Sequence, residues 1–377
     1  MKRLAAVAAA LLAACAMSDA HGSVAQASVA PSSPRPVRFT CRTMGARAGI
    51  TLVTADSTRA DSLARAAERS FFHVDSLMSN WTETSEVARI NRELSSSPLV
   101  IDPEVARVVR LALEVARGSD GAFDITVEPL VRLWGFIGGK PHVPRKEDLD
   151  VARSQVDYRR LALVDDPHKP TLAIKPRLDP GLERFGQSEG SMRIDLGGIA
   201  KGYAVDLAAK ELRSAGVENA LVDVTGNMFA LGHPPDRIGW RVGVRDPRDR
   251  TSILGEVVLS GLGIATSGQY EQFVAENGQR YGHILDPRSG WPVRGTLSVT
   301  VVSRSAFTSD AWDTALFVLG PRRAREVAEE HDEFDAIVVT PARDGESAPD
   351  TVWVESSART RFELAPAARG LVVVRSY

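Results

Sequence analysis

Two aspartates and a threonine near the C-terminal end of the chain have spacing that suits a metal site. Asp310, Asp313 and Thr314 stand at i, i+3 and i+4 of the stretch SDAWDTALFVLG, and such positions share one face of a helix. Two carboxylates and a hydroxyl form a hard, oxygen-rich set that suits Mg²⁺. If Ser309 caps this helix, the acids could instead only stabilise its first turn through the helix dipole. The residues alone leave both interpretations open.

A second candidate is the stretch RIDLGGIAKGYAVD, from Arg193 to Asp206. Its pattern predicts a short strand that ends at Asp195, a turn with two glycines, and a helix with Lys201 in its first turn. Backbone N–H groups and a lysine at a helix N-terminus suit a phosphate group. The spacing matches neither of the common phosphate-binding glycine motifs, and a strand-to-helix connection can need glycine for tight packing alone.

Two further stretches carry side chains that could serve the same chemistry. IATSGQYEQF places Thr266, Ser267 and Gly268 after a strand, where the hydroxyls could contact a phosphate or ribose, or only close a turn. RYGHILDPRSG places His283 and Asp286 in a strand followed by a turn. His283 could act as a general base for a hydroxyl, although a lone histidine is more often structural.

The elements that must position these residues follow a mixed pattern. A hairpin is predicted over residues 37–56, and helices are predicted at 57–78, 85–94 and 103–118. Further strands are predicted near 219–232, 239–247, 255–268, 280–287, 296–306, 334–341, 351–356 and 361–366, with helices at 310–319 and 321–329. Strands and helices do not alternate regularly, so a barrel or a simple doubly wound sheet is not expected. The pattern predicts a mixed α/β fold of the α+β kind.

The N-terminus has the features of an export signal. The basic start MKR precedes eleven apolar residues, too few to span a bilayer, and the stretch ends in LAAC at Cys15. Small residues before a cysteine resemble the bacterial lipoprotein cleavage box; the alternative is an ordinary secretory signal with a chance cysteine. We expect a signal peptide at 1–14, a flexible tether rich in Ala, Ser and Pro at 15–36, and one folded domain at 37–377.

The composition narrows the class of protein. The 377 residues are 44% hydrophobic and 25% charged, which is enough for a large buried core. The formal net charge of −2 without blocks of like charge argues against a nucleic-acid partner. Besides Cys15 the chain has only Cys41, so neither a disulfide framework nor a zinc cluster is expected.

Taken together, these segments resemble the ApbE-type flavin transferases, also called FAD:protein FMN transferases. The resemblance runs from about Val37 to the end of the chain, and its motifs stand in family order: TMGA, MSNWTETSEVARIN, GAFDITVEPLVRLWGF, IDLGGIAKGYAVD, TSGQY, HILDPRSG and SDAWDTALFVLG. Ala46 replaces the usual threonine, and TGN at 225–227 replaces the usual Gly-Gly-Asn or Gly-Gly-Asp. The resemblance implies two interleaved subdomains with an FAD cleft between them.

The resemblance also implies a role for each matching residue. Mg²⁺ would be held by the side chains of Asp310, Asp313 and Thr314 and by the backbone carbonyl of Gly198. His283 would help to deprotonate the hydroxyl of an acceptor protein. The residues near FAD would be Met44, Trp81, Ala122, Phe123, Asp124, Asp195, Lys201 and Ile284.

The implied reaction is Mg²⁺-dependent transfer of FMN from FAD, the substrate, to a threonine or serine hydroxyl, with release of AMP. The family's acceptors are extracytoplasmic flavoproteins, such as subunits of sodium-pumping NADH:quinone reductases. Such acceptors fit an exported enzyme that is anchored to a bacterial membrane by a lipid on Cys15 and faces the periplasm. Two alternatives remain: an FAD pyrophosphatase, with water as the nucleophile, and a non-catalytic FAD-binding lipoprotein. The intact acids, Thr314 and His283 argue against the second alternative.

Overall fold

The computed structural model describes residues 33–176, 192–249, 251–269, 272–342, 350–355, 357–370 and 372–377. The signal peptide, the lipid on Cys15 and most of the tether fall outside these residues and remain predictions. The first strand begins at Arg35, just before the expected start of the domain. In the described part of the chain, no helix is long and apolar enough to cross a membrane.

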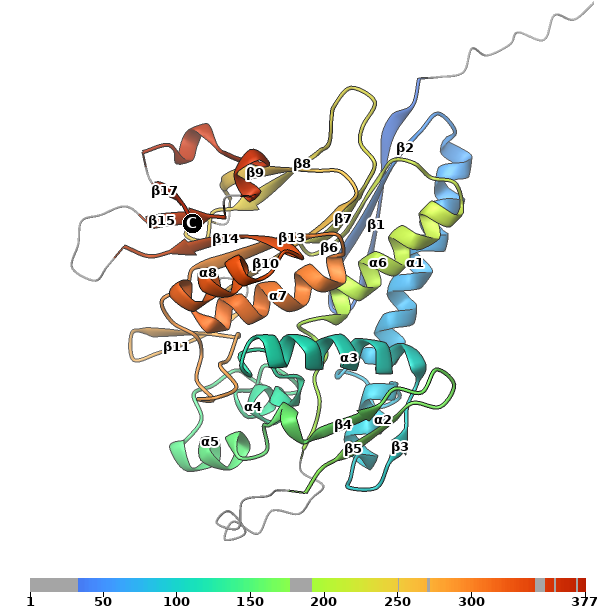
Figure 1. Cartoon of the computed structure of the whole chain (residues 1–377). Coiled ribbons are helices and arrows are strands. Elements are labelled where there is room, and N and C mark those ends of the chain that lie inside the picture. The colour runs from blue at the N-terminus through green and yellow to red at the C-terminus, as the bar shows by residue number, and fades with distance from the viewer. Residues whose placement is uncertain are drawn as a thin grey trace, which may run out of the picture.

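A nine-stranded sheet forms the centre of the molecule (Figure 1). Its strands are β1 (Arg35–Thr43), β2 (Ala46–Thr54), β6 (Ala220–Val224), β7 (Asn227–Leu231), β10 (Leu262–Gly268), β13 (Ser298–Ser303), β14 (Phe334–Thr340), β15 (Asp350–Val354) and β17 (Val372–Ser376). They lie in the order β1-β2-β6-β7-β10-β13-β14-β15-β17. Only the pair β15 and β17 is parallel; all other neighbours in this sheet are antiparallel.

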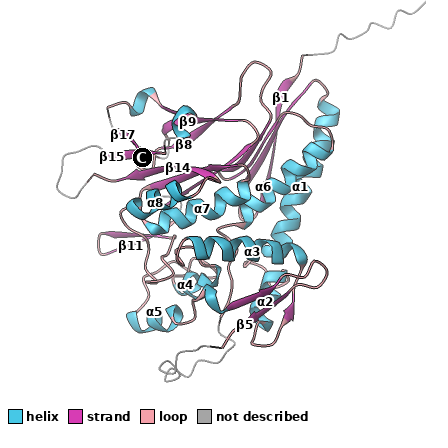
Figure 2. Ribbon diagram, viewed as in Figure 1, coloured by secondary structure: helices cyan, strands magenta, loops and turns pink. Residues whose placement is uncertain are grey.

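The two faces of this sheet are covered differently (Figure 2). One face carries the helices α1 (Ser57–Met78), α6 (Ala200–Ser214), α7 (Ala306–Leu319) and α8 (Pro321–Glu330). The other face carries a small sheet in the order β16-β9-β8, formed by β8 (Trp240–Arg245), β9 (Ile253–Leu259) and β16 (Phe362–Leu364). Each face closes a separate hydrophobic core, around Phe71 and Leu316 under the helices and around Val257 and Ile337 under the small sheet.

The chain between α1 and α6 forms a smaller part, which packs against α7 through α3. It contains α2 (Glu86–Glu93), α3 (Pro103–Gly118), the 3-10 turn η1 (Ile125–Val127), α4 (Glu128–Leu133), α5 (Lys146–Arg153), the 3-10 turn η2 (Tyr158–Arg160) and the strands β3 (Leu99–Val100), β4 (Leu161–Val164) and β5 (Thr171–Ile174). A separate hairpin joins β11 (Phe273–Glu276) and β12 (Gln279–Gly282), and the 3-10 turns η5 (Ala358–Thr360) and η6 (Pro366–Ala368) lie near the C-terminus. The two parts are therefore interleaved in sequence, and the predicted mixed α/β fold is confirmed.

Local signals predicted the first helices well. α1 and α3 have the predicted ends, because Asp56 and Asp102 cap them by accepting hydrogen bonds from N–H groups of the first turn. The predicted N-cap of α2 is also confirmed, since Ser85 Oγ accepts the N–H of Ala88 at 2.9 Å.

The predicted start of α7 is wrong. The helix begins at Ala306 and its N-cap is Ser305, not Ser309. Ser305 Oγ accepts the N–H of Thr308 at 3.2 Å. A tertiary contact adds to this local cap: the carboxylate of Asp206 on α6 accepts the N–H groups of Ala306 and Phe307 at 2.9 and 3.2 Å. The contribution of Asp206 comes from about a hundred residues earlier in the chain, so neighbouring residues could not reveal it.

Several features of the strands differ from the predictions. Residues 192–196 are extended but pair with no strand in the described chain; the side chain of Asn91 takes the backbone bonds of Ile194 instead. The hydroxyl residues Thr266 and Ser267 lie inside β10 rather than in a turn after it. β17 was not predicted, since its parallel partner β15 is reached only through tertiary structure.

Candidate active site

The two aspartates of α7 lie buried beneath the helix, with exposures of 3% for Asp310 and 2% for Asp313. Asp310 Oδ2 accepts the backbone N–H of Gly202 at 2.8 Å. Asp313 Oδ1 accepts hydrogen bonds from the hydroxyls of Ser267 and Thr314, both at 3.1 Å. Neither acid lies in the first turn of α7, so stabilisation of the helix start does not explain them.

Burial raises the pKa of both carboxyl groups, while the positive charge of Lys201 opposes the rise. The pKa of Asp313 is raised well above its usual value, because the nearby charge of Asp310 adds to the effect of burial. Lys201 Nζ lies 3.9 Å from Asp310 Oδ1 and is the cation closest to the pair among the described ion pairs. Two buried acids with one such neighbour form a site that favours a bound cation.

The surrounding donors fit Mg²⁺. Gly202 is the third residue of α6, so its N–H has no carbonyl partner within the helix, and it bonds to Asp310 instead. The carbonyl of Gly198 accepts none of the backbone hydrogen bonds described around this turn. Gly198 also lies close to Thr314: a Cβ added to Gly198 would stand 3.8 Å from Thr314 Oγ1. The set is carboxylate, carboxylate, hydroxyl and carbonyl, all oxygen. Within the described residues, no group of three or more His, Cys, Asp or Glu side chains forms an alternative metal cluster.

Gly202 allows α6 and α7 to approach closely at this site. A Cβ at position 202 would collide with the carbonyl oxygen of Ala306 and lie 2.7 Å from the Cβ of Asp310. We expect Gly202→Ala to lower the free energy of unfolding by about 3 kcal/mol, measured by chemical denaturation. Gly49→Ala is the control, because its added methyl would make only ordinary van der Waals contacts, with the flexible end of Arg38 at 3.4 Å and the carbonyl oxygen of Phe39 at 3.7 Å. Equal stability of the two variants would contradict this account of Gly202.

The glycine turn before α6 is held by hydrogen bonds with the residues on either side of it, Asp195 and Lys201. Asp195 Oδ1 accepts the N–H of Gly197 and the side-chain amide of Asn80, both at 2.9 Å. Lys201 Nζ donates to the carbonyl of Gly197 at 2.9 Å while it faces Asp310. Lys201 thus lies between the glycine turn and α7, where its positive charge is available to an anionic ligand.

The segment 122–124 contributes from the smaller part of the molecule. Ala122 and Phe123 are buried, and the ring of Phe123 lies 3.3 Å from the place of a Cβ on Gly198. The carboxylate of Asp124 accepts hydrogen bonds from Thr126 and from the N–H of Tyr158. Burial raises the pKa of Asp124 to about 6. The contacts of Asp124 are structural, so its predicted place along the cofactor stays a prediction.

Three other predicted residues lie on different elements. Met44 occupies the turn between β1 and β2 with a φ of 50° and donates its N–H to Asp75 of α1 at 2.9 Å. Trp81 follows α1 and is 68% exposed, which leaves its ring free to stack on a ligand. Ile284 is buried in the core beneath the helices.

His283 follows β12 directly. Its N–H donates to the carbonyl of Gln272 at 3.1 Å, and its ring packs edge to face on Phe136 with 6.3 Å between centroids. The adjacent Gly282 packs against the side chain of Gln269, which follows the end of β10. His283 is thus linked through Gln269 to the strand that carries Ser267.

Sequence reasoning did not assign three residues that the structure brings into the site. Ser267 was noted as a hydroxyl, but its bond to Asp313 was not foreseen. Asp206 fixes the start of α7, and Asn80 binds Asp195. Asp206 stands four residues after Gly202, on the same face of α6. This spacing was the one feature of the sequence that could have indicated that Asp206 faces α7.

The chain matches a known protein family along most of its length. The sequence model of the ApbE family matches residues 44–338. The FAD:protein FMN transferase of Escherichia coli K12 is 31% identical over 290 residues, 76% of this chain and 79% of the relative. The FAD:protein FMN transferase of Treponema pallidum is 32% identical over 274 residues, 69% of this chain and 72% of the relative.

Solved structures agree with these relatives. The flavin transferase ApbE from Vibrio cholerae has a TM-score of 0.74 at 30% identity and covers 87% of this chain and 99% of its own. The apo flavinyl transferase ApbE from Pseudomonas stutzeri has a TM-score of 0.70 at 30% identity, with 90% and 97% coverage. Fold and relatives define this chain as an enzyme of the transferase class. It belongs to the ApbE family.

Proposed function

We propose that this protein transfers FMN from FAD to a threonine or serine hydroxyl of an acceptor flavoprotein, with Mg²⁺ as cofactor and AMP as the second product. The observation that carries the proposal is the buried pair Asp310 and Asp313, beside Lys201 and the glycine turn. This arrangement combines donors for a metal ion with a cation and a backbone that a pyrophosphate can approach closely.

The side chains of Asp310, Asp313 and Thr314 and the carbonyl of Gly198 would hold Mg²⁺. When bound, the ion would neutralise charge on the pyrophosphate and stabilise the departing AMP. Lys201 supplies a further positive charge beside the turn.

His283 would accept the proton of the acceptor hydroxyl. The hydroxyl oxygen attacks the FMN-side phosphorus of FAD, and the bond from that phosphorus to the AMP phosphate breaks. FMN remains on the acceptor as a phosphoester, AMP leaves, and the proton stays on His283 until solvent removes it.

Residues from both parts of the molecule would line FAD. The exposed ring of Trp81 could stack on an aromatic ring of the cofactor, and Phe123 lies beside Gly198. We assign the remaining cofactor contacts to Met44, Ala122, Asp124, Asp195, Lys201 and Ile284.

We also propose that the protein is exported and anchored by a lipid on Cys15, so that the enzyme faces the periplasm. The support is the sequence LAAC after a short apolar stretch. An extracytoplasmic flavoprotein, such as a subunit of a sodium-pumping NADH:quinone reductase, would be the acceptor in that location.

The test is an assay with FAD, Mg²⁺ and the flavin-bearing subunit of a sodium-pumping NADH:quinone reductase. Mass spectrometry of the subunit should show the addition of one FMN, and chromatography should show AMP in equal amount. AMP without modification of the subunit would favour the pyrophosphatase. The absence of AMP would favour an FAD-binding protein without catalysis.

A further inference from the structure

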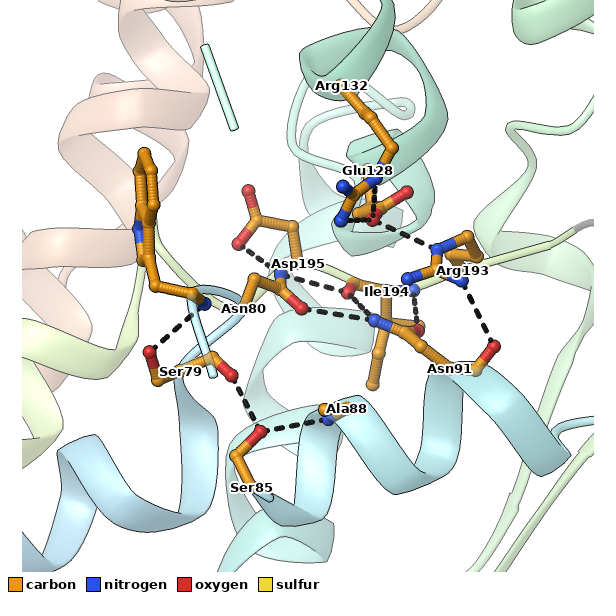
Figure 3. Close-up of polar contacts among 11 residues, drawn as sticks. Ser79, Asn80, Ser85, Ala88, Asn91, Glu128, Arg132, Arg193, Ile194 and Asp195 are labelled. Carbon is orange, nitrogen blue, oxygen red and sulfur yellow. Dashed lines mark hydrogen bonds and ion pairs between the residues drawn. The ribbon is translucent and has the colours of Figure 1, made fainter. Parts of the chain in front are cut away.

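The extended segment that carries Asp195 is held by the side-chain amide of Asn91. This amide makes the backbone hydrogen bonds that a neighbouring strand would make in a sheet. Asn91 Oδ1 accepts the N–H of Ile194 at 2.6 Å, and Asn91 Nδ2 donates to the carbonyl of Ile194 at 2.9 Å (Figure 3). Both backbone groups of Ile194 are thus satisfied by one side chain, which is only 5% exposed. Removal of that side chain would leave the buried N–H of Ile194 without this partner, while the carbonyl would keep only the longer bond from Asn80 Nδ2 at 3.2 Å.

A second amide extends this contact to Asp195. Asn91 Nδ2 also donates to Asn80 Oδ1 at 3.1 Å, and Asn80 Nδ2 donates to Asp195 Oδ1 at 2.9 Å. The chain of bonds runs from α2 through Asn80 to the carboxylate of Asp195, as the dashed lines in Figure 3 show. Asn80 therefore fixes the side chain of Asp195, and its second bond, to the carbonyl of Ile194 at 3.2 Å, helps Asn91 to fix the backbone just before it.

The other side of the segment is held by ion pairs to a buried glutamate. Glu128, at the start of α4, is 0% exposed. Its Oε1 lies 2.9 Å from Arg193 Nε and 2.7 Å from Arg132 Nη2. Arg193 precedes Ile194, so the segment is tied to α4 on one side and to α2 on the other.

These contacts connect the two halves of the site. Asp195 leads directly into the glycine turn and α6, whose Gly202 N–H binds Asp310, whereas Asn91 and Glu128 belong to the smaller part. A shift of residues 194 and 195 would therefore move the cofactor-facing turn relative to the metal-binding face of α7.

We infer that Asn91 is a positioning residue for FAD, which acts through Ile194 and through Asn80 on Asp195. This inference rests on the proposed function, because it assigns FAD as the ligand of Asp195. Asn91 itself is not among the residues assigned to FAD or Mg²⁺. Loss of Asn91 should weaken the binding of FAD more than it slows the transfer step. The reason is that the contact with FAD would be weakened equally in the bound complex and in the transition state, which raises KM and leaves kcat nearly unchanged.

The test measures FAD binding by the quenching of flavin fluorescence, without Mg²⁺ or acceptor, so that no turnover occurs. We expect Asn91→Ala and Asn80→Ala to raise the dissociation constant about tenfold. In the complete assay, KM for FAD should rise by a similar factor with little change in kcat. Asn80→Asp should bind more weakly than Asn80→Ala, because its carboxylate would face that of Asp195.

Asn219→Ala is the matched control. This substitution also removes an amide that accepts a backbone N–H, that of His233 at 2.8 Å, but the amide lies outside the network around Asp195. The variant should therefore bind FAD as the wild type does. If the wild type binds FAD and both alanine variants bind it equally tightly, the positioning role is overturned and the proposed function stands. If the wild type does not bind FAD, the proposed function fails and the inference with it. Should Asn91→Ala not fold, Asn80→Ala and Asn80→Asp decide the matter.

Discussion

Replacement of Asp313 by asparagine is expected to lower the rate of FMN transfer about a thousandfold, while it raises the melting temperature of the metal-free protein. The rate should fall because an amide is a poor ligand for Mg²⁺, and loss of the ion removes several kcal/mol of stabilisation from the transition state. Stability should rise because the variant no longer carries two buried acids with one neighbouring lysine. A role in folding alone would not produce these opposite effects.

The pH dependence of this gain follows from the raised pKa of Asp313. A carboxyl group whose pKa is higher in the folded than in the unfolded protein binds its proton more tightly when folded. Its destabilising effect therefore grows as pH rises through the unfolded pKa, about 3.9, and is complete above the folded pKa. The stabilisation by Asp313→Asn should be present at neutral pH and absent in strong acid, as measured by thermal melts in EDTA.

Two comparisons make the Asp313 result decisive. Mg²⁺ should raise the melting temperature of the wild type by mass action, but not that of Asp313→Asn. Asp335→Asn is the control variant, because Asp335 is paired with Arg361 away from α7 and should keep full activity. Undiminished transfer by Asp313→Asn at saturating Mg²⁺ would refute the assignment of this ligand.

Elements with signals in their own sequence were predictable. α1 and α3 were placed with the correct ends, because an apolar face and polar capping residues lie within each segment. The start of α7 was missed because its cap was placed at Ser309 instead of Ser305, and the bonds from Asp206 of α6 that support the earlier start are tertiary contacts. The extended segment before the glycine turn looked like a strand because its composition is that of a strand, but its backbone partner is the side chain of Asn91.

The candidate site shows the same division. The spacing of Asp310, Asp313 and Thr314 along one helix was visible in the sequence, and so was the glycine turn that faces them. The alternative of dipole stabilisation could be removed only when the true helix start was known. The bond between Ser267 and Asp313 joins residues on different elements, and no local pattern encodes such a contact.

The role of His283 is inferred from its position, because no described hydrogen bond joins it to Asp310 or Asp313. Its ring is supported edge-on by Phe136, and its backbone is fixed to Gln272. The neighbouring Gly282 contacts Gln269 at the end of β10. The imidazole is thus held against Phe136, one residue from a glycine that packs on the end of β10, and we assign to it the role of a base that receives a proton from an incoming hydroxyl.

Glutamine at position 283 should therefore lower kcat for FMN transfer about a hundredfold or more, because an amide has similar polarity but does not accept the proton. The affinity for FAD should not change, as measured by flavin fluorescence, since the proposed role begins only when the acceptor arrives. His142→Gln is the control: His142 is exposed on a loop and touches the carbonyl of Lys140, so this variant should transfer at the wild-type rate. A wild-type rate in His283→Gln would exclude His283 as the base and leave deprotonation of the hydroxyl to another group or to solvent.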